Sequence, residues 1–289
     1  MPSSFPNRVV IFRILWRTVN ILLVVALLFV GYSATWEYSV RRYLRGFSDA
    51  VVPSGFPPEQ KIDAILRWIR SGPPRPLAAQ PDELSKRDPE ATLNYRQLLE
   101  ICGTATNAFL NLARSSGLDT RRLLLLDSDR QTKHVVAEVL IEGRWIIVDP
   151  TYRTVLRDAH GRSLTRSDLK NPALFAEATS GIPNYPPQYN YDRFTHVRLS
   201  RIPFAGAGMR NFLRKSFPTW DEDFDWSLLL ERESFFAFFV STCFFVIFLL
   251  LRFVLAWYAD HHLRVSRYRL LHHIARAGVS FLYSPEIKE

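Results

Sequence analysis

An apolar run near the C-terminal end is the strongest constraint on how this chain folds. The run reads SFFAFFVSTCFFVIFLLLRFVLAWY over Ser234–Tyr258, and its first 18 residues carry no charge before Arg252. An α-helix rises about 1.5 Å per residue, so roughly 20 such residues cross the hydrocarbon core of a bilayer. A buried core helix with 18 uncharged residues in succession is a much poorer explanation. We therefore predict a transmembrane helix at 234–258.

A second apolar segment lies within residues 9–36, where Arg13 and Arg17 interrupt the N-terminal half. Two interpretations of this segment remain open. Small residues after its apolar centre also fit a cleavable signal peptide. Aromatic residues suited to a membrane interface favour an uncleaved anchor, which is our expectation, and these are Trp36, Tyr38 and Tyr43.

The distribution of charge around the second span predicts the orientation of the chain. Residues 259–276 hold four arginines and one acid, whereas residues 215–233 hold two basic and six acidic residues. The positive-inside rule places the side rich in arginine in the cytoplasm. With two spans in the inner (cell) membrane, both termini are then cytoplasmic and the domain between the spans is extracytoplasmic.

The net charge of +9 is partly a consequence of this topology. Residues 33–230 contain 27 basic and 23 acidic residues, and no basic patch interleaved with aromatic residues occurs among them. This pattern argues against a nucleic-acid partner. We expect a cytoplasmic tail at residues 1–8, an anchor at 9–36 and one folded domain at 37–200, with its core at 57–152. A juxtamembrane segment at 201–233, a transmembrane helix at 234–258 and a basic cytoplasmic tail at 259–289 follow.

Hydrophobic periodicity predicts the elements of the domain. An amphipathic helix starts at Pro57-Pro58, and a second helical stretch, 93–116, carries Cys102 and is terminated by Gly117. Short apolar runs predict strands. A helix is expected to start near Ser167 or Asn171. Two further stretches are expected to lack regular structure, one a long loop and the other an irregular segment rich in proline and tyrosine. The strands are at 121–126, 134–141 and 144–148, the loop is at 71–93, and the irregular segment is at 181–193.

The dipeptide Glu142-Gly143 between two strands predicts a two-residue hairpin turn. Facing residues then have numbers that add up to 285, which pairs Ile141 with Arg144 and places His134 opposite Thr151. Side chains alternate with a period of two, so His134 and Asp149 lie on one face as diagonal neighbours about 7–8 Å apart. The spacing predicts a hydrogen bond between their side chains.

Cysteine is scarce, since Cys243 lies in the predicted span and leaves Cys102 as the only thiol of the exported domain. No intramolecular disulfide can therefore form there, and Cys102 is either a buried structural residue or a reactive one. The start of a helix favours a thiolate. With Cys102 as nucleophile, His134 as its ion-pair partner and proton donor, and Asp149 to orient the imidazole, the three residue types suit acyl transfer.

The motifs C-G-T-A-T-x-x-F-L-x-L-A-R-x-x-G-L, H-V-V-A-E-V and G-R-W-I-I-V-D-P-T-Y resemble the bacterial transglutaminase-like superfamily, which has the papain-like thiol fold. The resemblance covers roughly Pro57–Tyr152. It implies an α+β fold, in which the helix that carries the cysteine packs on an antiparallel sheet. It also implies a catalytic Cys–His–Asp triad, whose positions are occupied by Cys102, His134 and Asp149.

The resemblance leaves the reaction open between hydrolysis of peptide or protein amides and cross-linking to an amine. Hydrolysis is favoured, because an amine acceptor requires the exclusion of water. The alternative is a non-catalytic scaffold or partner-binding module of the cell envelope. We expect no cofactor and no metal, since no calcium-binding loop motif occurs within 57–200. The acidic run Asp221–Asp225 fits a solvated face better than a cation site.

No substrate-binding residue can be assigned from the sequence. The backbone N–H of Cys102 is the natural first oxyanion donor. For the second donor, Tyr95 and Gln97 are candidates by proximity alone. Three tyrosines of the irregular segment either rim the cleft or belong to a loop packed by its own side chains, and these are Tyr185, Tyr189 and Tyr191. Trp68 and Trp145 are expected in the core.

Overall fold

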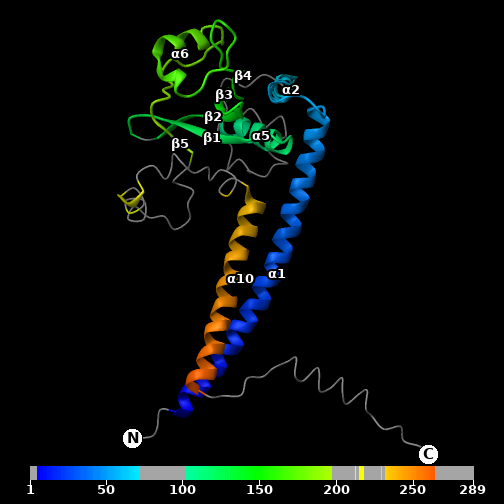
Figure 1. Cartoon of the computed structure of the whole chain (residues 1–289), viewed down its shortest axis with the longest axis vertical. Coiled ribbons are helices and arrows are strands. Elements are labelled where there is room, and N and C mark those ends of the chain that lie inside the picture. Colours follow the sequence, from blue (N-terminus) through cyan, green and yellow to red (C-terminus); the bar gives the residue numbers. More distant parts are fainter. Residues whose placement is uncertain are drawn as a thin grey trace, which may run out of the picture. The chain divides into compact units, whose positions relative to one another are not determined.

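The computed structural model describes residues 5–71, 102–129, 131–196, 212, 215–217, 229 and 232–263. The chain divides into two compact units. One contains the residues up to Val30 together with those from Ser241 onward, and the other runs from Gly31 to Val240. Figure 1 gives the labels of the elements used below.

Two helices are long and apolar enough to cross a membrane, and they match the two spans predicted from the sequence. They are α1 (Phe5–Val51) and α10 (Glu233–Tyr258), the latter continuing as a π-helical turn at Ala259–Leu263. α1 continues without a break past residue 36, where the anchor was expected to end, and reaches Val51. Their length and composition are consistent with membrane anchoring.

The charged side chain inside the second apolar run has partners within the first unit. Arg252 of α10 donates a hydrogen bond from Nε to Oδ1 of Asn20 in α1 at 3.0 Å. Its guanidinium group also lies 5.5 Å from the centre of the Trp16 ring. A cation in an apolar surrounding requires such partners, so these contacts explain how α10 accommodates a charge.

The second unit is built on one antiparallel sheet with the strand order β4-β3-β2-β1-β5 (Figure 1). Glu142 and Gly143 both have positive φ, 49° and 77°, which is the conformation of a type I′ turn. Ile141 pairs with Arg144 and Ala137 with Val148, so the predicted register of the hairpin is confirmed. The strands are β1 (Thr120–Leu126), β2 (Thr132–Ile141), β3 (Arg144–Asp149), β4 (Thr154–Val155) and β5 (Phe194–Thr195).

Regular helices cover one side of the sheet, which we call the helix face. Here α2 (Pro58–Ser71), α5 (Cys102–Ser115) and the last turns of α1 pack against alternate residues of β2 and β3, such as Ala137 and Val148. The predicted helices therefore form, and Gly117, with φ +83°, ends α5 as expected. The core on this face is aliphatic apart from Phe109.

A segment of short elements covers the opposite side, which we call the loop face. It contains a 3₁₀ turn (Asp168–Lys170) and α6 (Pro172–Thr179), so both predicted helix starts are used. Asn171 caps α6, because its side chain accepts a hydrogen bond from the backbone N–H of Ala173 at 3.0 Å. Residues from these elements pack onto Val136 and Ile147 of the sheet.

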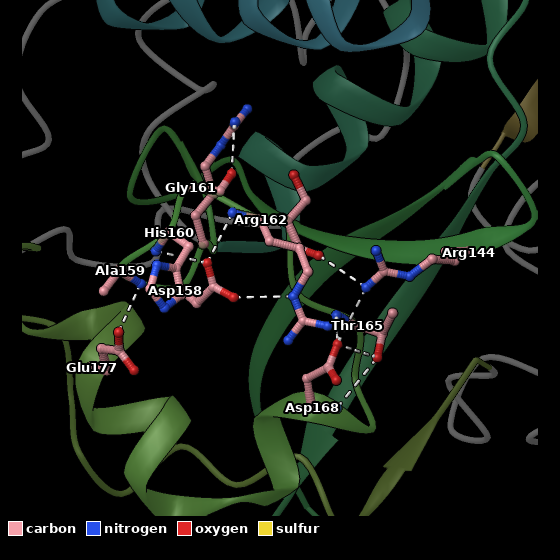
Figure 2. Close-up of polar contacts among 11 residues, drawn as sticks. Arg144, Asp158, Ala159, His160, Gly161, Arg162, Thr165, Asp168 and Glu177 are labelled. Atoms are coloured by element: carbon pink, nitrogen blue, oxygen red, sulfur yellow. Dashed lines mark hydrogen bonds and ion pairs between the residues drawn. The ribbon is translucent and has the colours of Figure 1, made fainter.

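Carboxylates that bind backbone N–H groups hold the connection between β4 and the 3₁₀ turn (Figure 2). Asp158 accepts hydrogen bonds from the backbone N–H groups of His160 and Arg162 at 3.0 and 2.9 Å, and from Arg162 Nε at 3.0 Å. Asp168 accepts two more from Thr165. Side chains of the connection therefore satisfy its backbone N–H groups. Leu156 and Leu164 flank the turn at Asp158–Arg162 and pack in the core of the loop face.

Within the second unit, a buried acidic residue of α1 holds the beginning of α10. The Glu37 carboxylate accepts a hydrogen bond from Ser234 Oγ at 2.7 Å and pairs with Arg41 at 2.6 Å and Arg232 at 3.2 Å. Glu37 is only 4% exposed, and a buried acidic side chain requires hydrogen-bond and ion-pair partners of this kind. The contact joins positions that are 197 residues apart in the chain.

Candidate active site

Cys102 is the first residue of α5, and its half-buried thiol is not part of a disulfide. The first backbone N–H groups of an α-helix have no partner within the helix, so they favour negative charge near the start of α5. Thr106, one turn further along, donates a hydrogen bond from Oγ1 to the carbonyl oxygen of Val135 at 2.9 Å. This contact holds the start of α5 against β2, beside His134.

His134 and Asp149 form the hydrogen bond that the hairpin register predicts. His134 Nε2 lies 2.7 Å from Asp149 Oδ2, and both side chains are buried. The Cys102 side chain forms a hydrogen bond with the imidazole as well. Since Nε2 is directed to Asp149, Nδ1 is the ring nitrogen that remains for the thiol. The structure therefore brings together the three residues named from the sequence.

The Asp149 carboxylate is held by four hydrogen-bond donors. Its Oδ1 accepts from the backbone N–H groups of Thr151 and Tyr152 at 3.0 and 3.3 Å. Its Oδ2 accepts from Tyr185 Oη at 3.1 Å as well as from His134. A fully buried carboxylate requires such hydrogen-bond partners. Asp149 is therefore fixed in position and orients the imidazole through Nε2.

Tyrosine side chains enclose the imidazole. The ring of Tyr189 lies parallel to that of His134, with centroids 4.3 Å apart and an angle of 3° between the planes. Tyr152 and Tyr185 present their rings at steep angles, with centroids 5.9 and 6.5 Å from that of His134. The irregular segment thus places Tyr185 and Tyr189 beside the imidazole, and its tyrosines also pack against one another, so features of both interpretations are present.

These neighbours shift the acid–base properties of His134. Burial is the largest single influence and acts to lower its pKa, but the Asp149 carboxylate and Cys102 outweigh it and raise the pKa to about 9. The pKa of Tyr185 is raised far above its ordinary value, first by burial and then by Tyr191 and Asp149. His134 is therefore held as an imidazolium at neutral pH, beside a tyrosine that remains a proton donor.

A cavity of about 660 Å³ lies next to the site. Leu125, which lines it, is the residue of β1 that pairs directly with His134. Tyr189 lines the same cavity and stacks on the imidazole. The wall is mixed in character, with apolar residues, amides and charges of both signs, and it consists of Leu125, Leu126, Asp127, Ser128, Lys133, Gln188, Tyr189, Asn190, Asp192 and Arg193.

Other residues singled out from the sequence have structural surroundings or lie outside the described part. Trp68 packs edge-on against Phe47, and Trp145 lies under the guanidinium of Arg121 at 4.1 Å, so neither contributes to the site. Tyr95, Gln97 and the Asp221–Asp225 run lie outside the described residues. Among the described residues, no group of three or more His, Cys, Asp or Glu side chains could hold a metal ion.

Comparison with known proteins gives one match. Residues 45–150 match the family model of the transglutaminase-like superfamily. The chain contains a transglutaminase-like domain. Members of this superfamily are typically cysteine-based enzymes, which makes a thiol enzyme possible here. Neither the search of curated proteins nor the search of solved structures returned a match.

The match includes Cys102, His134 and Asp149, and it ends at residue 150, so the irregular segment 181–193 with its tyrosines lies outside it. Tyr185 was not assigned a role from the sequence, because nothing in the sequence around it indicates its contact with Asp149, 36 positions away. The only signal that could have drawn attention to it is the concentration of tyrosines over 185–191 in a segment without regular periodicity.

Proposed function

We propose that this transglutaminase-like domain is a thiol enzyme that acts on peptide or protein amides through a thioester on Cys102. The observation that carries the proposal is the contact between a thiol at the start of α5 and an imidazole held by a buried carboxylate. In this proposal Cys102, His134 and Asp149 are the catalytic residues. Hydrolysis is the proposed outcome, which makes the protein a peptidase or amidase.

In the first step, Sγ of the Cys102 thiolate attacks the carbonyl carbon of the amide. The oxyanion that develops receives a hydrogen bond from the backbone N–H of Cys102 at the start of α5. The imidazolium of His134 gives its proton to the amide nitrogen, the C–N bond breaks, and the amine leaves. The products of this step are a thioester and a neutral imidazole.

In the second step, neutral His134 takes a proton from water while the water oxygen attacks the thioester carbonyl. The C–S bond breaks, and the carboxylic acid and the thiolate form. Asp149 holds the imidazole in orientation throughout and stabilises its charged form. An amine in place of water would give a new amide, which is the cross-linking reaction.

The test is labelling of the full-length chain in detergent with a biotinylated iodoacetamide, with Cys243→Ala as the background. We expect fast labelling at pH 6, absent in Cys102→Ala and slowed at least about tenfold in His134→Ala, because the ion pair produces the thiolate. Labelling that is unchanged in His134→Ala would support a non-catalytic scaffold instead.

The reaction itself is tested with a glutamine-containing peptide in H₂¹⁸O, with and without added butylamine. Hydrolysis predicts one ¹⁸O atom in the product carboxylate, detected by mass spectrometry. A product that carries butylamine without ¹⁸O would show amine transfer. The matched control is the same incubation with Cys102→Ala.

We also propose the division into segments predicted from the sequence and the orientation predicted from the charges. In this arrangement, the domain at 37–200 is anchored in the inner membrane and lies outside the cytoplasm. The two apolar helices and the arginine-rich segment 259–276 support it. A reporter that is active only outside the cytoplasm, inserted after Gly161 in an exposed turn, is expected to be active there. Activity of a cytoplasmic reporter at the same position would contradict the proposed orientation.

A further inference from the structure

Two buried tyrosines extend the hydrogen bonds of the site away from the thiol. Tyr185 Oη lies 3.1 Å from Asp149 Oδ2 and 3.2 Å from Tyr191 Oη. Tyr191 is 1% exposed and Tyr185 9% exposed. The same carboxylate oxygen also accepts the hydrogen bond from His134 Nε2 at 2.7 Å. Asp149 Oδ2 is therefore shared between the imidazole and a phenol.

The direction of these hydrogen bonds is determined by chemistry. An ionised carboxylate only accepts, so the single hydroxyl proton of Tyr185 is donated to Asp149. The bond between the two phenols must then run from Tyr191 to Tyr185. Each donor polarises the next one in such a chain, so Tyr191 makes Tyr185 a stronger donor to the carboxylate. The raised pKa values of both phenols keep their protons in place across the working pH range.

We propose that Tyr185, oriented by Tyr191, is a positioning residue that sets how tightly Asp149 holds the imidazole and how readily His134 releases its proton. The proposal rests on the function proposed above. A hydrogen bond from Tyr185 withdraws negative charge from Oδ2, so the carboxylate attracts the imidazolium less strongly. Without it, His134 would keep its proton to higher pH and transfer it less readily to the leaving amine.

Apart from Tyr185, the groups that face the imidazole are the same in every variant used in the test. The titratable residues around His134 come from α5, from β3 and the turn after it, and from the irregular segment, and they are Cys102, Asp149, Tyr152, Tyr185 and Tyr189. Further along the same face of β2, Glu138 pairs with Arg121 at 2.6 Å and lies 3.8 Å from His196. Only the two phenols named above are changed.

The experiment is the pH dependence of Cys102 alkylation by iodoacetamide in the full-length Cys243→Ala chain. Alkylation forms an S–C bond and releases iodide, and its rate changes where the neighbouring imidazolium loses its proton. We expect this transition to move upward by about half to one pH unit in Tyr185→Phe. Tyr191→Phe is the matched control, because it removes the bond between the phenols but leaves the bond to Asp149, and its shift should be less than half as large.

Tyr185→Phe leaves a buried Tyr191 hydroxyl without its acceptor, so a double variant with both tyrosines changed to Phe is included. It should reproduce the shift of Tyr185→Phe. A double variant with the wild-type profile, or equal shifts in the two single variants, would overturn the proposal. If the wild-type profile is that of an ordinary thiol, with no transition near pH 9, the result contradicts the proposed function itself and not only the role of Tyr185.

Discussion

The two faces of the sheet are covered in different ways, and they bury different chemistry. The helix face is covered by α2, α5 and the end of α1, and its cluster of buried residues is apolar. The loop face is covered by short elements and irregular chain, and it buries His134 and Asp149 together with Glu138 and His196. The helix face also buries polar side chains, such as Arg122 and Asn107, but the pair of His134 and Asp149 lies on the loop face.

The difference shows what each kind of covering can provide. A helix satisfies its own backbone and presents mainly side-chain carbon to the sheet, so it suits an aliphatic core. An irregular segment can direct backbone N–H groups and tyrosine hydroxyls inward, as Thr151 and Tyr185 do for Asp149. Buried polar groups require such partners. The loop face can therefore carry a charged site.

The largest expected effect comes from the helix face. Ile65→Ala removes a fully buried side chain from α2 and should lower the free energy of unfolding by about 4 kcal/mol. The iodoacetamide profile of Cys102 should not change, because no polar partner of the site is lost. Urea unfolding of the full chain in detergent, followed by tryptophan fluorescence, measures the first quantity. A shifted pH profile would show that the two faces are coupled.

Asp149→Asn tests the loop face through the pH dependence of stability. The pKa of His134 is raised from its ordinary value of 6.5 to about 9 in the folded state. The stabilisation from this shift is fully present below about pH 6.5 and is lost as pH rises through about 9. We expect Asp149→Asn to remove about 3 kcal/mol at pH 6 from this source, and progressively less toward pH 10.

The measurement is the difference in unfolding free energy between wild type and Asp149→Asn at several pH values. A difference that stays constant from pH 6 to pH 10 would mean that the ion pair with His134 does not stabilise the fold. Asp158→Asn is the matched control, since Asp158 binds only its own turn on the same face.

Tyr189→Ala should have a smaller effect, because it removes one ring from the surface of the imidazole. We expect a loss of about 1 kcal/mol of stability and faster alkylation of Cys102 by bulky iodoacetamides, since the ring covers His134. Tyr189→Phe keeps the stacked ring and should resemble wild type in both assays. Equal behaviour of the Ala and Phe variants would mean that the stacked ring does not shield the site.

The smallest effect is expected at the hairpin turn, which belongs to neither face. Glu142 has a φ of 49°, a conformation that asparagine adopts more readily than glutamate. Glu142→Asn should therefore raise the unfolding free energy by about 0.5 kcal/mol without changing the pH profile. A loss of stability would contradict the turn geometry.

The contact between His134 and Asp149 could be predicted from the sequence because it depends on local chemistry. A two-residue turn at Glu142-Gly143 sets the pairing of β2 and β3, and strand alternation then assigns each side chain to a face. The start of α5 at Cys102 could not be placed by periodicity alone, which indicated only a helical stretch from residue 93. Cys102 was singled out instead as the only thiol between the two predicted spans, and the family motif then matched it to the position of the nucleophile.

The rest of the site could not be predicted, for two physical reasons. Tyr185 reaches Asp149 from an irregular segment, whose path depends on packing over the whole loop face rather than on any local pattern. The continuity of α1 was missed because the change from apolar to charged residues near Glu37 resembled a boundary. A helix passes through such a change when its charges find partners, as Glu37 and Arg41 do one turn apart.

The bond between Glu37 and Ser234 also bears on the entropy of the chain. It ties together two positions 197 residues apart, so nearly the whole second unit is a closed loop. The hydrogen bond forms only on folding, so closing this loop costs conformational entropy, and that cost grows only slowly with the length of the loop. In the folded domain, the two ends of the second unit are therefore held together by a noncovalent contact, which is lost whenever the domain unfolds.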